Sequence, residues 1–148
     1  HICTPYLIVD NEMVVALCTA AKSGVDVKII TPHHADKWYV HAVTRAYYPV
    51  LMESGVQIYE YTPGFIHAKS FVVDGEYATV GTVNLDYRSL YLHFECGVWM
   101  YGAPCIQAME EDYQLTLSKS QLFTKEDCRT SWWARLGQSM LRLLAPLM

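Results

Sequence analysis

The sequence contains no uninterrupted apolar run near the ~18 residues that a membrane-spanning helix needs, and no basic and apolar leader at its start. Glycine and proline are sparse, with 8 and 6 residues, which excludes collagen-like and low-complexity chains. The cysteines are odd in number and have no C-x-x-C or paired histidine spacing, so neither a zinc site nor a disulfide framework is indicated. They are typical of reduced thiols in a protein that faces the cytosol.

The composition that is present is typical of a globular chain. Of its 148 residues, 52% are hydrophobic and 18% are charged, which is enough for one domain with its own core. The formal net charge of −4 argues against nonspecific binding to nucleic acid. The chain begins at His1 rather than with methionine, which indicates a piece of a longer protein.

Strands and helices are predicted to alternate over the first sixty residues. Short β-rich runs are expected at 5–9, 25–30 and 56–61, with helices between them at about 12–22 and 36–54. Such alternation predicts crossover connections and parallel strand pairing. The fold class is therefore α/β, with a mixed, largely parallel β-sheet flanked by helices on both faces.

The pattern changes after Pro63-Gly64. A hairpin is expected from 65–73 and 77–80, because Asp74-Gly75 between two β-rich runs is a strong hairpin signal. A further strand is expected at 93–101 and a helix at 103–119, with its acidic residues exposed to solvent. We assign residues 1–121 to one catalytic domain and 122–148 to a C-terminal helical appendage.

One segment carries a pattern of polar residues that points to chemistry on a phosphate. It reads H-x-K-x₄-D-x₆-G-[ST]-x-N, and its fixed positions are His67, Lys69, Asp74, Gly81, Thr82 and Asn84. Six fixed residues at about 5% frequency each would match by chance in on the order of one in a million such chains.

The spacing of this pattern places its polar groups together. Residues two apart on a strand share a face, so Lys69 is expected beside His67, and Asn84 beside Thr82. Lys69 then offers a charge to a phosphate, Thr82 and Asn84 offer neutral donors, and His67 offers a nitrogen that can attack phosphorus or carry a proton. We expect no metal and no other cofactor, because no carboxylate cluster suited to Mg²⁺ accompanies the pattern.

The pattern resembles the signature of the phospholipase D superfamily. The longer run around it, from Ser54-Gly55-Val56 through Gly64-Phe65-Ile66-His67-Ala68-Lys69 to Asn84-Leu85-Asp86-Tyr87-Arg88-Ser89, is similar to the second, C-terminal half of bacterial cardiolipin synthases. The likeness extends over nearly the whole chain, and no position of the signature departs from it.

The resemblance implies a two-step displacement at a phosphodiester through a phosphohistidine, in which two histidines act from opposite sides. Only one signature is present, so the second histidine has to come from a missing N-terminal half with its own H-x-K signature or from a second copy of this chain. The resemblance makes His67 the general acid and base, and Glu95 the carboxylate that orients it; the alternative for Glu95 is a solvated strand residue. Arg88 is expected either to contact a lipid phosphate or to brace its loop.

The remaining candidates are given structural interpretations. Asp74 lies at the hairpin turn, beyond the reach of a phosphate held by His67, and fixes turn geometry, while Gly81 belongs to the same structural part of the signature. The pair His33-His34 with Asp36 resembles a metal cluster only superficially, and a solvated loop is the better interpretation.

The function that this resemblance implies is phosphatidyl transfer between two phosphatidylglycerol molecules, which yields cardiolipin and glycerol at the bacterial cytoplasmic membrane, with no nucleic acid as partner. Phosphatidylethanolamine stays open as the acceptor. The first alternative is a homodimeric phosphodiesterase or nuclease with a single signature. The second is a lipid-binding module in which the signature is a relic, which the complete signature disfavours.

The C-terminal residues differ in charge from the rest of the chain. Beyond Cys128 the only charged residues are arginines at 129, 135 and 142. At about 100° per residue, the large apolar side chains there fall within one arc of a helix. They are Trp132, Trp133, Leu136, Met140, Leu143, Leu144 and Leu147. We expect this stripe either to pack on the domain or to lie in the interface of an anionic bilayer.

Overall fold

The computed structural model describes residues 1–128 together with 137, 140 and 141. The elements are β1 (Ile2–Cys3), β2 (Leu7–Ile8), α1 (Asn11–Lys22), β3 (Lys28–Pro32), α2 (Trp38–Glu53), β4 (Gln57–Tyr61), β5 (Ser70–Val73), β6 (Tyr77–Gly81), β7 (Leu85–Asp86), a π-helical turn (Arg88–Leu92), β8 (Gly97–Tyr101), α3 (Cys105–Ser118) and β9 (Ser120–Leu122). Within these residues, no helix has the length and apolarity to cross a bilayer.

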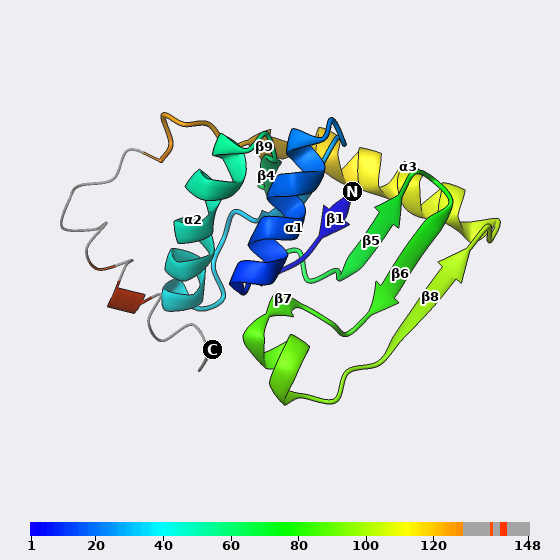
Figure 1. The fold of residues 1–148 in the computed structure, drawn as a ribbon, viewed down its shortest axis with the longest axis horizontal. Helices are drawn as coiled ribbons and strands as arrows, with labels where there is room; N and C mark the ends of the chain where they lie inside the picture. The colour runs from blue at the N-terminus through cyan, green and yellow to red at the C-terminus, as the bar shows by residue number, and fades with distance from the viewer. Residues whose placement is uncertain (129–136, 138–139, 142–148) are drawn as a thin grey trace.

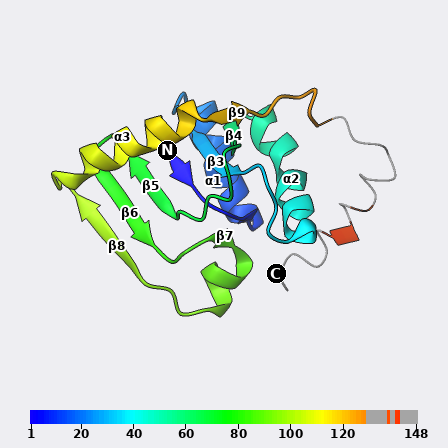
Figure 2. The same cartoon turned by 180° about the vertical axis from the view of Figure 1, so that it is seen from behind.

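The strands form a seven-stranded sheet in the order β8-β6-β5-β1-β3-β4-β9, and β2 pairs separately with β7. Helices α1 and α2 lie on one face of the large sheet and α3 on the other (Figures 1 and 2). This confirms the mixed α/β architecture with helices on both faces. The expectation that the sheet is largely parallel is wrong. In the described residues, parallel pairing in the large sheet is confined to β1, β3 and β4, because β5, β6, β8 and β9 pair with their neighbours in antiparallel fashion.

The two faces of the sheet are buried by alternating side chains. On β3, Ile29 belongs to the core under α1 and α2, whereas Ile30 packs with Tyr113 of α3 on the opposite face. Both isoleucines are fully buried. This is why β3 is an apolar run rather than an alternating one, as strands covered on both faces are.

The hairpin between β5 and β6 forms as its Asp-Gly pair predicts. Asp74 and Gly75 have φ values of 53° and 67°, and the Glu76 N–H donates to the Val73 carbonyl at 3.1 Å. Two successive residues with positive φ make a type I′ turn, whose twist matches that of the flanking strands. Asp74 thus lies in the turn, at the end of the hairpin opposite to His67.

Several boundaries differ from the sequence expectation. The strand expected from 65 begins only at Ser70, because its partner β1 ends at Cys3 and Pro5 has no N–H to continue a ladder. The strand expected from 93 begins at Gly97, after an irregular segment. At the other end, β9 runs one residue past the expected domain boundary at 121.

The described chain continues the core beyond that boundary. Phe123 is buried, with its ring centroid 4.9 Å from that of Tyr48 on α2. The stripe of large apolar residues expected from 132 to 147 lies, apart from Met140, outside the described residues, and Met140 is exposed.

Strands β6 and β8 approach one another closely at a pair of glycines. Gly81 lies opposite Gly97 in the ladder. A Cβ atom added to Gly81 would lie 2.3 Å from the Cys96 carbonyl oxygen and 2.5 Å from the Gly97 Cα. Both obstacles are backbone atoms, so the strands would have to separate to make room. The glycine of the signature is therefore required by strand packing beside the site.

We predict that Gly81→Ala lowers the free energy of unfolding by about 1–3 kcal/mol, the usual range for forcing extra atoms into a packed position. Denaturant unfolding followed by circular dichroism measures this change. Gly64→Ala is the matched control, because no atom lies within 4 Å of the Cβ it would add. Equal midpoints for the two variants would contradict the packing argument.

Candidate active site

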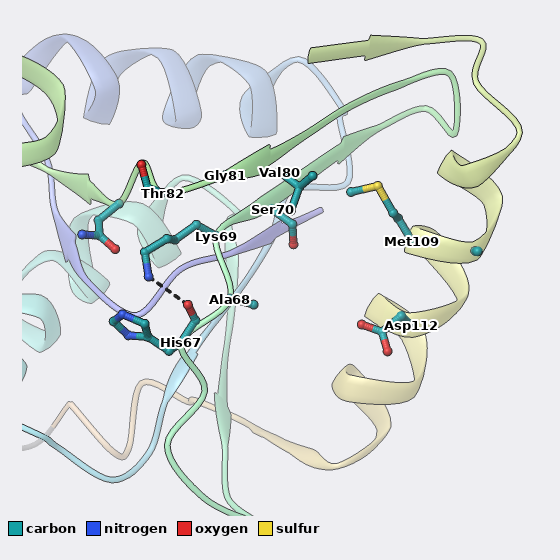
Figure 3. Close-up of a pocket in the computed structure, with 11 residues that line it drawn as sticks. His67, Ala68, Lys69, Ser70, Val80, Gly81, Thr82, Met109 and Asp112 are labelled. Atoms are coloured by element: carbon teal, nitrogen blue, oxygen red, sulfur yellow. Dashed lines mark hydrogen bonds between the residues drawn. The ribbon is translucent and has the colours of Figure 1, made fainter. Parts of the chain in front are cut away.

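The signature residues meet in a hollow of about 860 Å³ at the edge of the sheet. One wall is made by the segment leading into β5 and by the end of β6, and the other by α3, from which Met109 and Asp112 face the strands (Figure 3). The lining residues from the signature are His67, Lys69, Gly81, Thr82 and Asn84. The structure thus brings together the polar groups that the spacing predicts to be neighbours.

His67 and Lys69 are joined through the backbone. The Lys69 ammonium donates to the His67 carbonyl oxygen at 2.8 Å, which holds the lysine side chain back toward the histidine. The His67 ring is exposed and lies between aromatic neighbours, with ring centroids 6.3 Å from Tyr6 and 5.5 Å from Phe65.

The charges of the two residues are coupled. The pKa of His67 is lowered, mainly by desolvation in the hollow and secondly by the nearby Lys69 ammonium. The Asp36 carboxylate opposes this shift. Desolvation also lowers the pKa of Lys69, against the attraction of Glu95 and Asp86. The lowered pKa favours a neutral imidazole at pH 7 in the unliganded site, and a neutral ring has a nitrogen free to accept a proton.

Asn84 lines the hollow just before β7. Its Nδ2 donates to the Ser89 hydroxyl at 3.1 Å, and its Oδ1 is buried with no hydrogen-bond partner among the described residues. An amide nitrogen carries two hydrogens, so one remains for a ligand after the bond to Ser89 is made. Asn84 therefore keeps the donor that the sequence analysis assigns to it.

The side chains of Thr82 and Glu95 form a hydrogen bond. The Thr82 hydroxyl donates to a Glu95 carboxylate oxygen and accepts from the Cys96 N–H at 3.0 Å. A hydroxyl has a single hydrogen, so this arrangement leaves Thr82 no donor for a phosphate, in contrast to the sequence expectation. Hydrogen bonding from Thr82, and then from Ser89, lowers the pKa of Glu95.

The bond between Glu95 and His67 that the sequence analysis expects is not formed in the described part of the chain. The reason is positional: Glu95 lies in the irregular segment before β8, where Thr82 is its nearest hydrogen-bond donor. Its negative charge instead attracts the Lys69 ammonium, which opposes the lowering of the Lys69 pKa by desolvation. In this state, Glu95 contributes charge to the site rather than a direct contact with the imidazole.

Arg88 does not line the hollow. Its Nε donates to the His93 ring at 2.7 Å, which ties the two ends of the π-helical turn together. Of the two alternatives for Arg88, this geometry matches the bracing one. Asp112 is exposed, as the sequence analysis expects of the acidic residues on this helix, and it also borders the hollow.

A separate group of charges surrounds His33. Its ring bonds to the buried carboxylate of Glu60 at 2.8 Å, and Arg45 binds the same carboxylate through Nε and Nη2. The buried Glu60 carboxylate is thus satisfied by hydrogen bonds to an arginine and a histidine. The described residues hold no set of three or more His, Cys, Asp or Glu side chains arranged for a metal.

Comparison with known sequences decides the family. Residues 1–116 match the family described as the phospholipase D-like domain of cardiolipin synthase. The chain belongs to this family. It is 40% identical to a cardiolipin synthase of Halalkalibacterium halodurans and 38% identical to one of Geobacillus kaustophilus, over 99% of this chain in both cases. It spans only 29% and 30% of those relatives.

Solved structures show the same phospholipase D-like fold. Nuc from Salmonella typhimurium, a phospholipase D family member, superposes with a TM-score of 0.70 at 20% identity, covering 84% of this chain and 80% of its own. Phosphatidylserine synthase from Haemophilus influenzae superposes with a TM-score of 0.68 at 21% identity, covering 99% of this chain and 39% of its own. The family and the fold inferred from the signature are both confirmed.

The coupling of Lys69 to His67 predicts a shift that can be measured in the isolated chain. Lys69→Met removes a positive charge that disfavours the imidazolium form, so the pKa of His67 rises. The measurement is the pH titration of the His67 ring protons by NMR. Lys125→Met serves as the control, since Lys125 is an exposed lysine outside the hollow. A midpoint that stays the same or falls in Lys69→Met would exclude the coupling.

Proposed function

We propose that this chain provides one half of the active site of a phosphatidyl-transferring enzyme that forms cardiolipin from two phosphatidylglycerol molecules. The observation that carries the proposal is the hollow in which His67, Lys69 and Asn84 converge, in a chain that belongs to the cardiolipin synthase family. Cardiolipin synthases are also the relatives at 38% and 40% identity.

The charges of the hollow fit an anionic phosphodiester. Lys69 supplies a positive charge, and the free amide hydrogen of Asn84 supplies a neutral donor. A bound phosphate raises the pKa of His67 by electrostatic attraction, in opposition to Lys69. Substrate binding therefore prepares the imidazolium form that a general acid requires.

In the proposed reaction, a histidine from a second half-site attacks phosphorus, and the bond from phosphorus to the glycerol oxygen breaks. His67 gives its proton to that oxygen, and glycerol leaves. Neutral His67 then removes the proton from the hydroxyl of a second phosphatidylglycerol, whose oxygen attacks phosphorus as the bond to the histidine nitrogen breaks. The product is cardiolipin, and both histidines return to their starting states.

Exposed apolar residues that suit contact with a second half-site precede Glu95 in the chain. Leu92 and Phe94 are 66% and 108% exposed, in the segment that leads to Glu95. The relatives are about three times the length of this chain, which leaves room for a second signature domain in them. A lipid substrate also implies contact with a membrane surface, for which the arginines beyond Cys128 provide positive charge.

We expect His67→Ala in the full-length protein to lower the rate of cardiolipin formation by about 10²–10⁴, the usual effect of losing an acid–base group. Thin-layer analysis of lipid products from phosphatidylglycerol vesicles measures the rate. His34→Ala is the control, because His34 is exposed and contacts His33 rather than the hollow. Full activity in His67→Ala, or loss of activity on addition of a chelator, would refute the proposed chemistry.

The half-site argument predicts that this chain folds as a monomer but does not turn over phosphodiesters, since one histidine cannot both attack phosphorus and protonate the leaving group. Size-selected monomer is assayed with phosphatidylglycerol and with a chromogenic phosphodiester. Turnover by monomer would contradict the prediction. Turnover confined to a dimer, with the chromogenic ester and not the lipid, would instead favour the homodimeric phosphodiesterase.

A further inference from the structure

Tyr6 does not line the hollow, but its ring contacts the imidazole of His67. The ring centroids are 6.3 Å apart and the ring planes are nearly perpendicular, at 78°. This is the edge-to-face geometry that aromatic pairs prefer. Tyr6 directly precedes β2, far from His67 in the sequence, so the contact joins the imidazole to a separate part of the fold.

The His67 ring depends on such contacts for its orientation. The His67 carbonyl accepts from Lys69, but no hydrogen bond to the ring is formed in the part of the chain that the structure describes. The Phe65 ring, 5.5 Å away, belongs to the same irregular segment before β5. A contact inside one segment cannot fix that segment against the rest of the fold. The contact with Tyr6 can, because Tyr6 belongs to another element.

The Tyr6 side chain is itself held at both ends. Its carbonyl accepts from the Thr4 hydroxyl at 2.8 Å, and its ring packs against the core under α1 and α2. At the far end of the ring, the Tyr6 hydroxyl donates to Asp36 Oδ2 at 2.6 Å. The other Asp36 oxygen accepts from the Lys37 N–H at 2.6 Å, in the loop between β3 and α2. Turning the Tyr6 ring away from His67 would therefore break its bond to Asp36.

Asp36 also brings a negative charge toward the imidazole. Desolvation and then Lys69 lower the pKa of His67, and the Asp36 carboxylate acts in the opposite direction. The sequence analysis assigns the orientation of His67 to Glu95, whose carboxylate bonds to Thr82 instead. Asp36 lies in the loop that the sequence analysis interprets as solvated, and its exposed carboxylate is bonded to a residue that contacts His67.

We propose that Tyr6 and Asp36 are positioning residues for His67. Asp36 fixes the Tyr6 ring, and the Tyr6 ring holds the imidazole in the orientation from which it exchanges its proton. The inference rests on the proposed function for the identity of that proton transfer, whereas the contacts from Asp36 through Tyr6 to His67 do not depend on it. Neither residue lines the hollow, so both act through His67 rather than on the substrate.

The first test follows the His67 ring protons by NMR in this chain. Tyr6→Leu removes the neighbouring ring, so the His67 ring-proton shifts change and the cross-relaxation between the two rings is lost. Tyr6→Phe keeps the ring without its bond to Asp36, and gives shifts between those of Tyr6→Leu and the unmodified chain. Asp36→Asn removes a charge that favours the imidazolium form, so the pKa of His67 falls.

Two matched variants serve as controls and leave the His67 shifts and pKa unchanged. Tyr101→Leu removes an exposed tyrosine of β8, which stacks on Tyr77 with ring centroids 4.7 Å apart. Glu111→Gln removes an exposed carboxylate of α3 that is bonded to Gln107 and does not line the hollow.

The second test uses the full-length enzyme. Tyr6→Leu lowers kcat for cardiolipin formation about two- to tenfold, the worth of one aromatic pair, and leaves KM within about twofold. Tyr6→Phe restores most of kcat, which a loss of general stability would not explain. In Asp36→Asn, the limb of the pH–rate profile on which His67 loses its proton moves to lower pH, because the pKa of His67 is lower.

The possible failures are distinguishable. Unchanged His67 shifts in Tyr6→Leu, or an unchanged His67 pKa in Asp36→Asn, would overturn the positioning role. Shifts in Tyr6→Phe equal to those of the unmodified chain would overturn the anchoring by Asp36. If Tyr6→Leu unfolds, Tyr6→Phe and the exposed Asp36→Asn still decide the outcome. Full activity in His67→Ala would refute the proposed function, while the NMR titration still tests the contacts.

Discussion

The site depends on a connection between the beginning of the chain and the segment after the hairpin. Strand β2 pairs with β7, and the buried Thr4 hydroxyl accepts from the Leu85 N–H, 81 residues away. Thr4 also donates to the Tyr6 carbonyl and lies beside Ile30 in the large sheet. Asn84 directly precedes Leu85, and Tyr6 packs its ring near His67. One small pairing thus holds the amide and the imidazole at the same hollow.

The sequence predicts those parts of the fold whose signals are long or chemically strong. Helices α1 and α2 follow from their apolar spacing, and the turn at Asp74-Gly75 follows from a dipeptide that tolerates positive φ. Strands β1, β2, β7 and β9 have two or three residues each, which is too short for a periodic pattern. Of these, only β2 lies within an expected strand, the β-rich run at 5–9, whereas β1, β7 and β9 depend on partners far away in the chain.

The same distinction holds within the site. The signature predicts that His67, Lys69, Thr82 and Asn84 meet, because spacing and residue type are enough for that. It does not predict that the Thr82 hydroxyl donates to Glu95, or that the Asn84 amide donates to the Ser89 hydroxyl. Both hydrogen bonds depend on the path of the segment between β7 and β8, where a hydroxyl has several possible hydrogen-bond partners. Ser89 directly follows Arg88 in the sequence, but its spacing from Asn84 does not by itself predict a hydrogen bond between the two.

The central position of β1 has a consequence for the growing chain. Ile2 pairs with Ile29 on one side and with Phe71 on the other, so β1 needs a partner that is made about 70 residues later. At a ribosomal rate of about 5–20 residues per second, one edge of β1 waits roughly 4 to 14 s for β5. The large sheet cannot close, and the hollow cannot form, until the hairpin has emerged. The hollow is therefore completed only after α1 and α2 have been synthesised.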